Sequence, residues 1–400
     1  MNPHDGRWSR RDFLKATGSA GLGAVMVPVG QIANATETHK KVPVRSFGKT
    51  GAKISILSLG GMFDIASNQI MMKQAVRWGV TYWDTADCYQ RGSETGIGKY
   101  FKKYPEDRNT IFLVTKSDAR NPRGMTRLLD RSIKRMNTNY IDLYFVHGIS
   151  DIGELDERTK IWAEKAKAEG KIRFFGFSTH RNMETCMLEA AKLGWIDGIM
   201  MTYNFRLMHT DRMKRAVKAC VKAGIGLTAM KTQGGGSVKT NTATELKMAG
   251  RFLQKGFTDA QAKLMAVWQN PNISSICSQM PNMTILKANV AAALNRTDLS
   301  VKDTDLLHRY AGETHSDYCA GCTQICESNV AMNVPIGDVM RYLMYFRSYG
   351  EFDYATAQFK TIPENVRLQM ENIDYSLAEK RCPQKMAIGK LMREAVNVLS

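Results

Sequence analysis

The stretch TYWDTADCY (residues 81–89) joins an apolar segment to an acidic residue and then to a tyrosine. Residues 81–83 are typical of a short buried strand, which ends at Asp84. Tyr89 follows five residues later, in what we expect to be a loop. The stretch therefore predicts a carboxylate and a phenol close together at one end of a strand.

Two later apolar segments end in groups that suit proton transfer. Residues 111–115 lead into Lys116, and residues 141–146 lead into His147. Further polar residues, among them Ser178 and Lys231, follow other apolar segments. A single charged strand end is usually a structural ion pair, but a series of them is typical of an active site built on strand ends.

The rest of the chain alternates between short apolar runs and amphipathic segments. We expect strands near residues 54–59, 81–84, 111–116, 141–147, 172–178, 198–204, 226–231 and 274–280, and helices near residues 69–78, 94–103, 126–136, 155–169, 183–193, 212–223, 260–269 and 283–294. This order predicts an α/β fold, a closed (β/α)8 TIM barrel, followed by a small helical cysteine-rich domain. An open doubly wound sheet would normally have a G-x-G-x-x-G turn after its first strand, and LGGM at 59–62 does not match it.

The chain resembles the aldo-keto reductases from about residue 42 to residue 293. The phrases that support the resemblance are FGKTGAKIS, DTADCY, GSETGIGKYF, FLVTK, DLYFVHG, GFSTH, TYN and AMKTQGGG. The resemblance implies a barrel over residues 42–300, a nicotinamide cofactor (NADP or NAD), and a small carbonyl or alcohol substrate. It also implies a catalytic set in which Tyr89 is the general acid/base, Lys116 lowers its pKa, Asp84 holds the lysine, and His147 orients the carbonyl oxygen.

The resemblance also implies cofactor contacts. Tyr203 should stack on the nicotinamide, Ser178 should lie near its amide, and Lys231 with the glycine loop should approach the phosphates. The full set of expected cofactor residues is Ser178, Tyr203, Asn204, Lys231, Gly234, Gly235 and Asn289. Two departures weaken the match: Met200 stands where the family usually has glutamine, and residues 277–282 contain no arginine or lysine to pair with the 2′-phosphate of NADP.

The first 35 residues are expected to be a signal peptide. SRRDFLK (residues 9–15) resembles the twin-arginine export motif, a weakly apolar run follows, and Ala33-Asn34-Ala35 fits a cleavage site. We therefore expect periplasmic localisation and no transmembrane segment in the mature chain. A basic amphipathic tail is the structural alternative.

Four cysteines follow the barrel, at Cys319, Cys322, Cys326 and Cys382. This spacing favours a [4Fe–4S] cluster in a helical domain over residues 310–400, and a subset of the family has a similar extension. The extension usually groups its cysteines more tightly, however. Two disulfides, a zinc site and free thiols remain as alternatives.

The formal net charge of +18 is spread over amphipathic helices, so a solvated surface is favoured over a nucleic-acid interface. Two functions remain open. One is an exported oxidoreductase, coupled to the iron–sulfur cluster and to a redox partner protein. The other is a periplasmic electron-transfer or binding protein on an aldo-keto reductase barrel with a degraded nicotinamide site.

Overall fold

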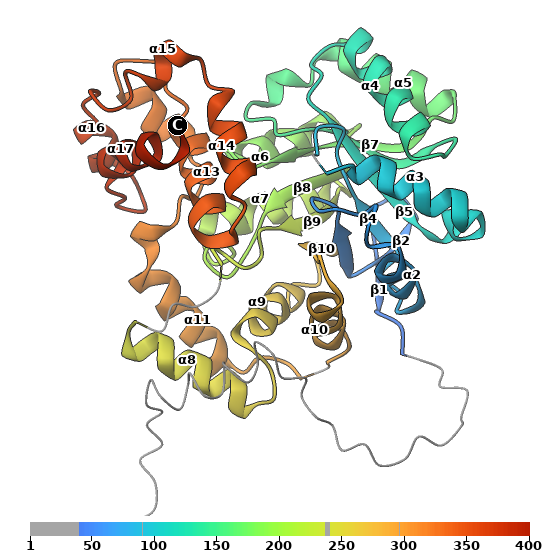
Figure 1. Cartoon of the computed structure of the whole chain (residues 1–400), viewed down its shortest axis with the longest axis horizontal. Coiled ribbons are helices and arrows are strands. Elements are labelled where there is room, and N and C mark those ends of the chain that lie inside the picture. The colour runs from blue at the N-terminus through green and yellow to red at the C-terminus, as the bar shows by residue number, and fades with distance from the viewer. Residues whose placement is uncertain (1–39, 90, 237–240, 296) are drawn as a thin grey trace, which may run out of the picture.

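The computed structural model describes residues 40–89, 91–236, 241–295 and 297–400 (Figure 1). Within them, eight parallel strands form a closed barrel in the order β10-β3-β4-β5-β6-β7-β8-β9. The strands are β3 (Leu57–Gly60), β4 (Tyr82–Asp84), β5 (Phe112–Ser117), β6 (Ile141–Val146), β7 (Ile172–Thr179), β8 (Gly198–Thr202), β9 (Gly226–Met230) and β10 (Ser275–Gln279). The predicted signal peptide lies outside the described residues.

Helices on the outside of the barrel follow the strands. They are α2 (Gln69–Arg77), α3 (Ser93–Lys103), α4 (Pro122–Arg135), α5 (Glu157–Ala168), α6 (Met183–Leu193), α7 (Asp211–Lys222), α9 (Asp259–Trp268) and α10 (Met283–Leu294). In α4, Met125 and Leu129 face the strands, whereas Arg127 and Arg131 are exposed, as expected for an amphipathic helix. The basic residues of this helix thus lie on a solvated face.

An antiparallel hairpin closes the N-terminal end of the barrel. The hairpin consists of β1 (Val44–Ser46) and β2 (Lys53–Ser55), so the predicted single strand over residues 54–59 was wrong: it is split between β2 and β3. Phe47, in the turn, is fully buried, and a Cβ on Gly198 or Gly226 would come within 2.6 or 2.5 Å of its ring. Glycine at these positions makes room for the Phe47 ring at the base of the barrel.

Two further helices were not predicted: α8 (Ala243–Gln254) and α11 (Val301–Glu313). They pack together below the barrel in Figure 1, where Arg251 Nε donates to Asp303 Oδ1 over 2.5 Å. The helix α8 is an insertion between β9 and α9, which breaks the simple strand–helix alternation.

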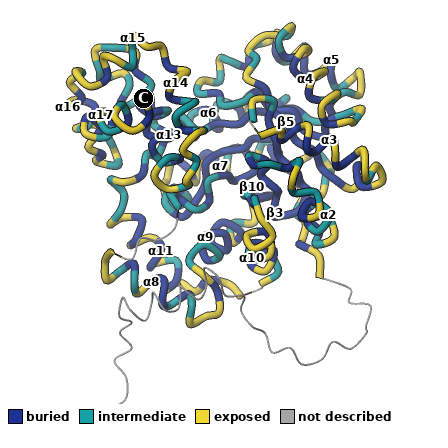
Figure 2. Tube along the Cα trace, viewed as in Figure 1, coloured by how far each residue is buried: buried dark blue, intermediate teal, exposed yellow. Residues whose placement is uncertain are grey.

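The last 80 residues form a helical region beside the C-terminal ends of the strands (Figure 1). Its helices are α12 (Thr323–Cys326), α13 (Ile336–Tyr349), α14 (Phe352–Lys360), α15 (Glu364–Arg367), α16 (Ser376–Arg381) and α17 (Ile388–Leu399). A hydrophobic cluster of their own, with Val339, Phe359 and Met392, is buried among them (Figure 2). These helices lie within residues 310–400, where a helical domain was predicted.

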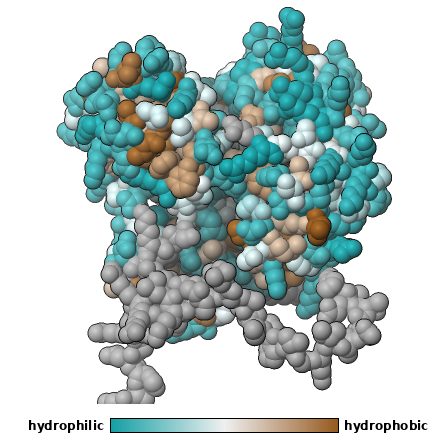
Figure 3. All heavy atoms as spheres, viewed as in Figure 1, coloured by the Kyte–Doolittle hydropathy of each residue, from teal (hydrophilic) through white to brown (hydrophobic). Residues whose placement is uncertain are grey.

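The surface shown in Figure 3 is mostly hydrophilic, with hydrophobic atoms gathered over the C-terminal helices. Exposed apolar side chains in that region include Phe352, Leu368, Leu377 and Val398. Among the helices of the described residues, none has the length and hydrophobicity to span a bilayer.

Candidate active site

The strand ends bring a buried ion pair and a phenol together. Lys116, near the end of β5, is 1% exposed, and its Nζ donates to Asp84 Oδ2 over 2.7 Å and to the Thr85 carbonyl over 2.7 Å. The same Nζ lies 3.3 Å from the hydroxyl of Tyr89 and 4.9 Å from the centre of its ring. The lysine is thus fixed by three oxygens, and Asp84 and Tyr89 both line the cavity described below.

His147 follows β6 directly and completes the group of four. Its ring meets the Tyr89 ring edge to face, with 6.1 Å between centroids and an interplanar angle of 76°. The structure therefore brings together Asp84, Tyr89, Lys116 and His147, the four residues predicted from the sequence.

The electrostatics of Tyr89 are dominated by burial. Burial raises the pKa of the phenol well above its ordinary value, and the Asp84 carboxylate raises it further. The lowering of this pKa by Lys116 stays a prediction, because burial sets the direction of the shift in the protein alone. Tyr89 is protonated at neutral pH, which is the form that can donate a proton.

Asp118 decides the tautomer of His147. Burial lowers the pKa of His147, so the ring is neutral at pH 7. Burial acts to raise the pKa of Asp118, but His147, Cys88 and Arg120 together lower it, so this carboxylate only accepts. Since Nδ1 lies 3.2 Å from Asp118 Oδ1, it must hold the proton, and Nε2 is left as an acceptor.

These groups face a cavity of about 660 Å³ at the C-terminal ends of the strands. The barrel supplies Asp84, Tyr89 and His147, together with Met200 and Met230. The C-terminal helices supply the opposite wall, with Arg341, Tyr345, Tyr349, Tyr354, Gln358 and Thr361. The cavity is therefore built jointly by the two parts of the chain.

The sequence pattern of the aldo/keto reductase family matches residues 57–310, more than half of the chain. The chain belongs to the aldo/keto reductase family. It is an oxidoreductase of the aldo-keto reductase kind, and the matched residues include the barrel and all four site residues.

Relatives and solved structures agree with this assignment. L-galactose dehydrogenase of Arabidopsis thaliana is 24% identical over 298 residues, covering 66% of this chain and 92% of the relative. An uncharacterised oxidoreductase of Bacillus subtilis is 26% identical, covering 62% and 90%. Two solved aldo-keto reductases have the same fold: one from Bacillus halodurans (TM-score 0.57, 23% identity, 67% and 96% covered) and one from Klebsiella pneumoniae, in complex with NADPH (TM-score 0.56, 22% identity, 67% and 95% covered).

Of the residues predicted to contact the cofactor, Lys231 lines the reductase cavity. Its Nζ donates to the hydroxyl of Tyr345 over 2.5 Å, and burial lowers its pKa. Its backbone has φ +54°, a left-handed conformation that is uncommon for a side chain of this size. Lys231 thus connects the end of β9 to α13.

Tyr203 does not lie in the cavity, so its predicted role in stacking was wrong. Side chains alternate along a strand, and Met200 and Thr202 point inward. Tyr203 consequently points outward, is 2% exposed, and accepts a hydrogen bond from Asn270 Nδ2 over 2.8 Å. Met230 occupies the cavity wall instead.

Three other predicted residues are held in structural hydrogen bonds and do not line the cavity. Ser178 Oγ accepts from Gly148 N over 3.0 Å, and Asn289 Nδ2 donates to Ser278 Oγ over 3.0 Å. Asn204 Nδ2 donates to the Lys231 carbonyl over 3.1 Å and to the Tyr318 hydroxyl over 2.9 Å. Their side chains shape the strand ends rather than the cavity surface.

The glycine loop after β9 is packed against other residues. A Cβ on Gly234 would come within 2.6 Å of the Phe205 ring, and one on Gly235 within 3.3 Å of Tyr318. A Cβ on Gly236 would lie 3.1 Å from the Ser348 carbonyl, at the end of α13. The loop expected to approach the cofactor phosphates is therefore in contact with the C-terminal region.

The four C-terminal cysteines line one small cavity among α12, α13 and the segment around Pro383. All four thiols are free. A tetrahedral zinc site would place its sulfur ligands roughly 3.8 Å apart, from Zn–S bonds of about 2.3 Å. Among the described residues, these cysteines do not form a group of three potential ligand atoms within 4.8 Å of one another. The iron–sulfur cluster, the two disulfides and the zinc site stay predictions.

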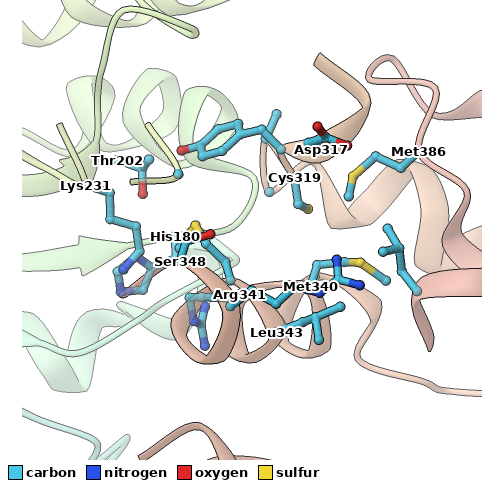
Figure 4. Close-up of a pocket in the computed structure, with 18 of the residues that line it drawn as sticks. His180, Thr202, Lys231, Asp317, Cys319, Met340, Arg341, Leu343, Ser348 and Met386 are labelled. Carbon is cyan, nitrogen blue, oxygen red and sulfur yellow. The ribbon is translucent and has the colours of Figure 1, made fainter. Parts of the chain in front are cut away.

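A cation-lined cavity lies between the cysteines and the active site (Figure 4). It shares Cys319 with the cysteine cavity, and it shares His180, Lys231 and Arg341 with the catalytic cavity. The Nδ1 atom of His180 is buried and has no hydrogen-bond partner among the described residues. The three cavities therefore form a series from the cysteines to Tyr89.

Sequence reasoning missed the C-terminal wall of the active site. Gln279 donates to Glu351 Oε1 over 2.9 Å, and Arg91 Nη2 lies 3.5 Å from Glu351 Oε2, so α14 is tied to both sides of the cavity. The rings of Tyr349 and Tyr354 both pack against the ring of Tyr345, with centroids 5.9 and 5.5 Å away.

Proposed function

We propose that this protein reduces a small carbonyl compound, or oxidises the corresponding alcohol, with a nicotinamide cofactor. The observation that supports this function best is the position of Lys116 Nζ, 2.7 Å from Asp84 and 3.3 Å from the Tyr89 hydroxyl, at the edge of the cavity. NADP is favoured because one solved relative contains NADPH and a Schizosaccharomyces pombe relative, 30% identical, is named for NADP(+).

The bound nicotinamide would supply or accept the hydride. Tyr89 stays protonated until the substrate oxygen develops negative charge, and then donates its hydrogen to that oxygen. Lys116 stabilises the phenolate that forms, since its ammonium is already in place at 3.3 Å. A positioned acid of this kind contributes roughly 10²–10⁴ in rate.

His147 takes a different role from the one implied by the family. With its proton on Nδ1, directed at Asp118, the ring cannot donate from Nε2 to a carbonyl oxygen. Nε2 instead accepts a hydrogen bond from a hydroxyl group, such as that of the product alcohol. Toward the cavity, the four site residues therefore present one hydrogen-bond donor, the Tyr89 hydroxyl, and one acceptor, His147 Nε2.

Replacing Tyr89 by phenylalanine tests this proposal. We expect Tyr89→Phe to lower turnover by about 10²-fold or more while nicotinamide affinity changes little, because the ring is kept. Tyr140→Phe is the matched control, since that hydroxyl lies away from the cavity. Turnover of Tyr89→Phe within tenfold of the parent, measured with a panel of aldehydes and ketones, would remove Tyr89 from the proposed role.

We also propose that Cys319, Cys322, Cys326 and Cys382 hold a [4Fe–4S] cluster that exchanges electrons with a redox partner. The convergence of four free thiols on one cavity supports this, as does the cation-lined cavity between them and the active site. Iron and sulfide analysis of anaerobically purified protein should find about four of each per chain. Cys382→Ser should lose the iron, whereas Cys220→Ala should keep it; equal iron in both variants would contradict the assignment.

Export to the periplasm by the twin-arginine route is part of the same proposal, and residues 9–15 and 33–35 are the features that support it. Changing Arg10 and Arg11 to lysine should leave the precursor in the cytoplasm. Periplasmic fractionation of the parent and the variant tests this directly, and equal export of both would contradict it.

A second candidate is an electron-transfer or binding protein on the same barrel. The packing of Tyr318 and Ser348 against the glycine loop favours it, because that space is where the cofactor phosphates were expected. Nucleotide content separates the two functions. Bound nicotinamide with a carbonyl-dependent change in absorbance supports the reductase, and iron without nicotinamide affinity supports the carrier.

A further inference from the structure

A second cluster of side chains lies in the catalytic cavity, beside the tetrad. Cys88 Sγ is 3.5 Å from His147 Nδ1, and Asp118 Oδ1 is 3.2 Å from the same nitrogen. All three potential ligand atoms lie within 4.8 Å of one another, and all three residues line the cavity. We propose that Cys88, Asp118 and His147 form a binding site for a divalent transition-metal ion, for which zinc is the best match.

The distances between the ligand atoms fit one tetrahedral ion. Zinc bonds of about 2.3 Å to sulfur and about 2.0–2.2 Å to nitrogen and oxygen place sulfur and nitrogen roughly 3.5 Å apart, and nitrogen and oxygen roughly 3.4 Å apart. The structure has 3.5 and 3.2 Å. Among the described residues, the C-terminal cysteines do not form a comparably close group of three potential ligand atoms.

The ligand types also favour zinc over other common ions. A thiolate with an imidazole suits zinc or another late first-row metal, whereas magnesium and calcium prefer oxygen ligands only. Three protein ligands leave a fourth position free, which is typical of zinc sites that also bind water or a substrate oxygen. In this protein that position faces the cavity.

The surroundings of Cys88 favour a cation. The Asp118 carboxylate lies beside this thiol, and both side chains face the cavity. The Oδ1 atom of Asp87 is buried and has no hydrogen-bond partner among the described residues. A divalent ion would balance the Asp118 carboxylate and allow the thiol to ionise.

Binding of the ion has a defined proton balance. The metal forms a bond to Sγ of Cys88 as the S–H bond breaks, and that proton leaves to solvent. The imidazole stays neutral, with its hydrogen transferred from Nδ1 to Nε2, because Nδ1 now binds the metal. His147 therefore changes from an acceptor to a donor toward the cavity when the ion is present.

Titration with Co²⁺ tests the site, because cobalt replaces zinc and its bonds to thiolates absorb in the near ultraviolet. We expect the holoprotein to bind one more Co²⁺ than Cys88→Ala does, with a thiolate-to-cobalt band in the difference spectrum and about one proton released per added ion. Asp118→Asn should weaken binding by about 100-fold or more, since losing even an outer-shell partner costs roughly 10–100-fold. Asp305→Asn, which removes an exposed carboxylate on α11, should bind as the parent does.

Equal stoichiometry and equal band intensity in the parent and Cys88→Ala would overturn the proposal, as would an unchanged affinity in Asp118→Asn. Circular dichroism of each variant confirms that it is folded, and the two substitutions test the site independently. The titration uses neither nicotinamide nor substrate, so its failure would leave the proposed reductase function untouched.

Discussion

Replacing Lys116 by methionine should destabilise the barrel by an amount that depends on pH. The substitution removes the only hydrogen-bond donor to Asp84 that the described residues provide, apart from a contact with Cys277. Asp84 is 2% exposed, and its second oxygen, Oδ1, has no partner there even in the parent. The carboxylate must therefore either stay charged without its partner or take up a proton on folding.

Protonation of Asp84 sets an upper limit on the stability that Lys116→Met loses. Holding a carboxyl with an unfolded pKa of about 3.9 in its neutral form costs about 4 kcal/mol at pH 7 and about 1.5 kcal/mol at pH 5. Breaking a buried ion pair costs roughly 3–5 kcal/mol, which is similar to the limit at pH 7. Burial already raises the pKa of Asp84 in the parent, so removal of Lys116 moves it further in the same direction. The variant should lose about 1.4 kcal/mol of stability per pH unit between pH 5 and 7, because its folded state holds one more proton than its unfolded state.

Urea unfolding followed by tryptophan fluorescence at pH 5, 6 and 7 measures this slope. Lys263→Met is the matched control, because Lys263 is also fully buried but its partner Asp259 is 21% exposed and keeps access to water. The control should lose stability equally at each pH. A stability difference between Lys116→Met and the parent that is the same at pH 5 and pH 7 would refute the reasoning.

Two further substitutions test the ends of the barrel. Gly198→Ala should lower the free energy of unfolding by about 1–3 kcal/mol, because its Cβ would lie 2.6 Å from Phe47. Gly312→Ala is the control, since open space surrounds that position, and it should be neutral or stabilising. Thermal unfolding compares the two variants, and equal midpoints would contradict the packing argument. Tyr345→Phe removes the 2.5 Å partner of Lys231 and should cost about 1.5–3 kcal/mol, with faster hydrogen exchange in α13. Unchanged exchange there would show that this hydrogen bond does not hold the C-terminal helices on the barrel.

The catalytic group was predictable because it depends on local order. Asp84, Lys116 and His147 each follow an apolar run, and parallel strands in a closed barrel must bring these ends to the same rim. The same inference fails for a residue that lies one position beyond the end of its strand. Tyr203 was placed in the site from its resemblance, but it lies one position beyond β8, where alternation directs it outward.

Long-range packing could not be predicted from local patterns. Lys231 and Tyr345 are 114 residues apart, and neither segment indicates the other. The burial of Tyr89 was also missed, since the sequence shows a lysine nearby but not how far burial raises the pKa of the phenol. Both errors concern burial, which depends on the assembled structure.

Because α13 and α14 form one wall of the cavity, the two sides of the cavity come from different parts of the chain. The four candidate site residues all precede residue 150, whereas the wall opposite them is formed by residues after 340. Substitutions at Tyr349, Tyr354 or Gln358 can therefore alter which compounds are accepted without touching the groups that react. An enzyme arranged in this way could acquire new specificities by exchange of its C-terminal helices alone, with the chemistry inherited unchanged.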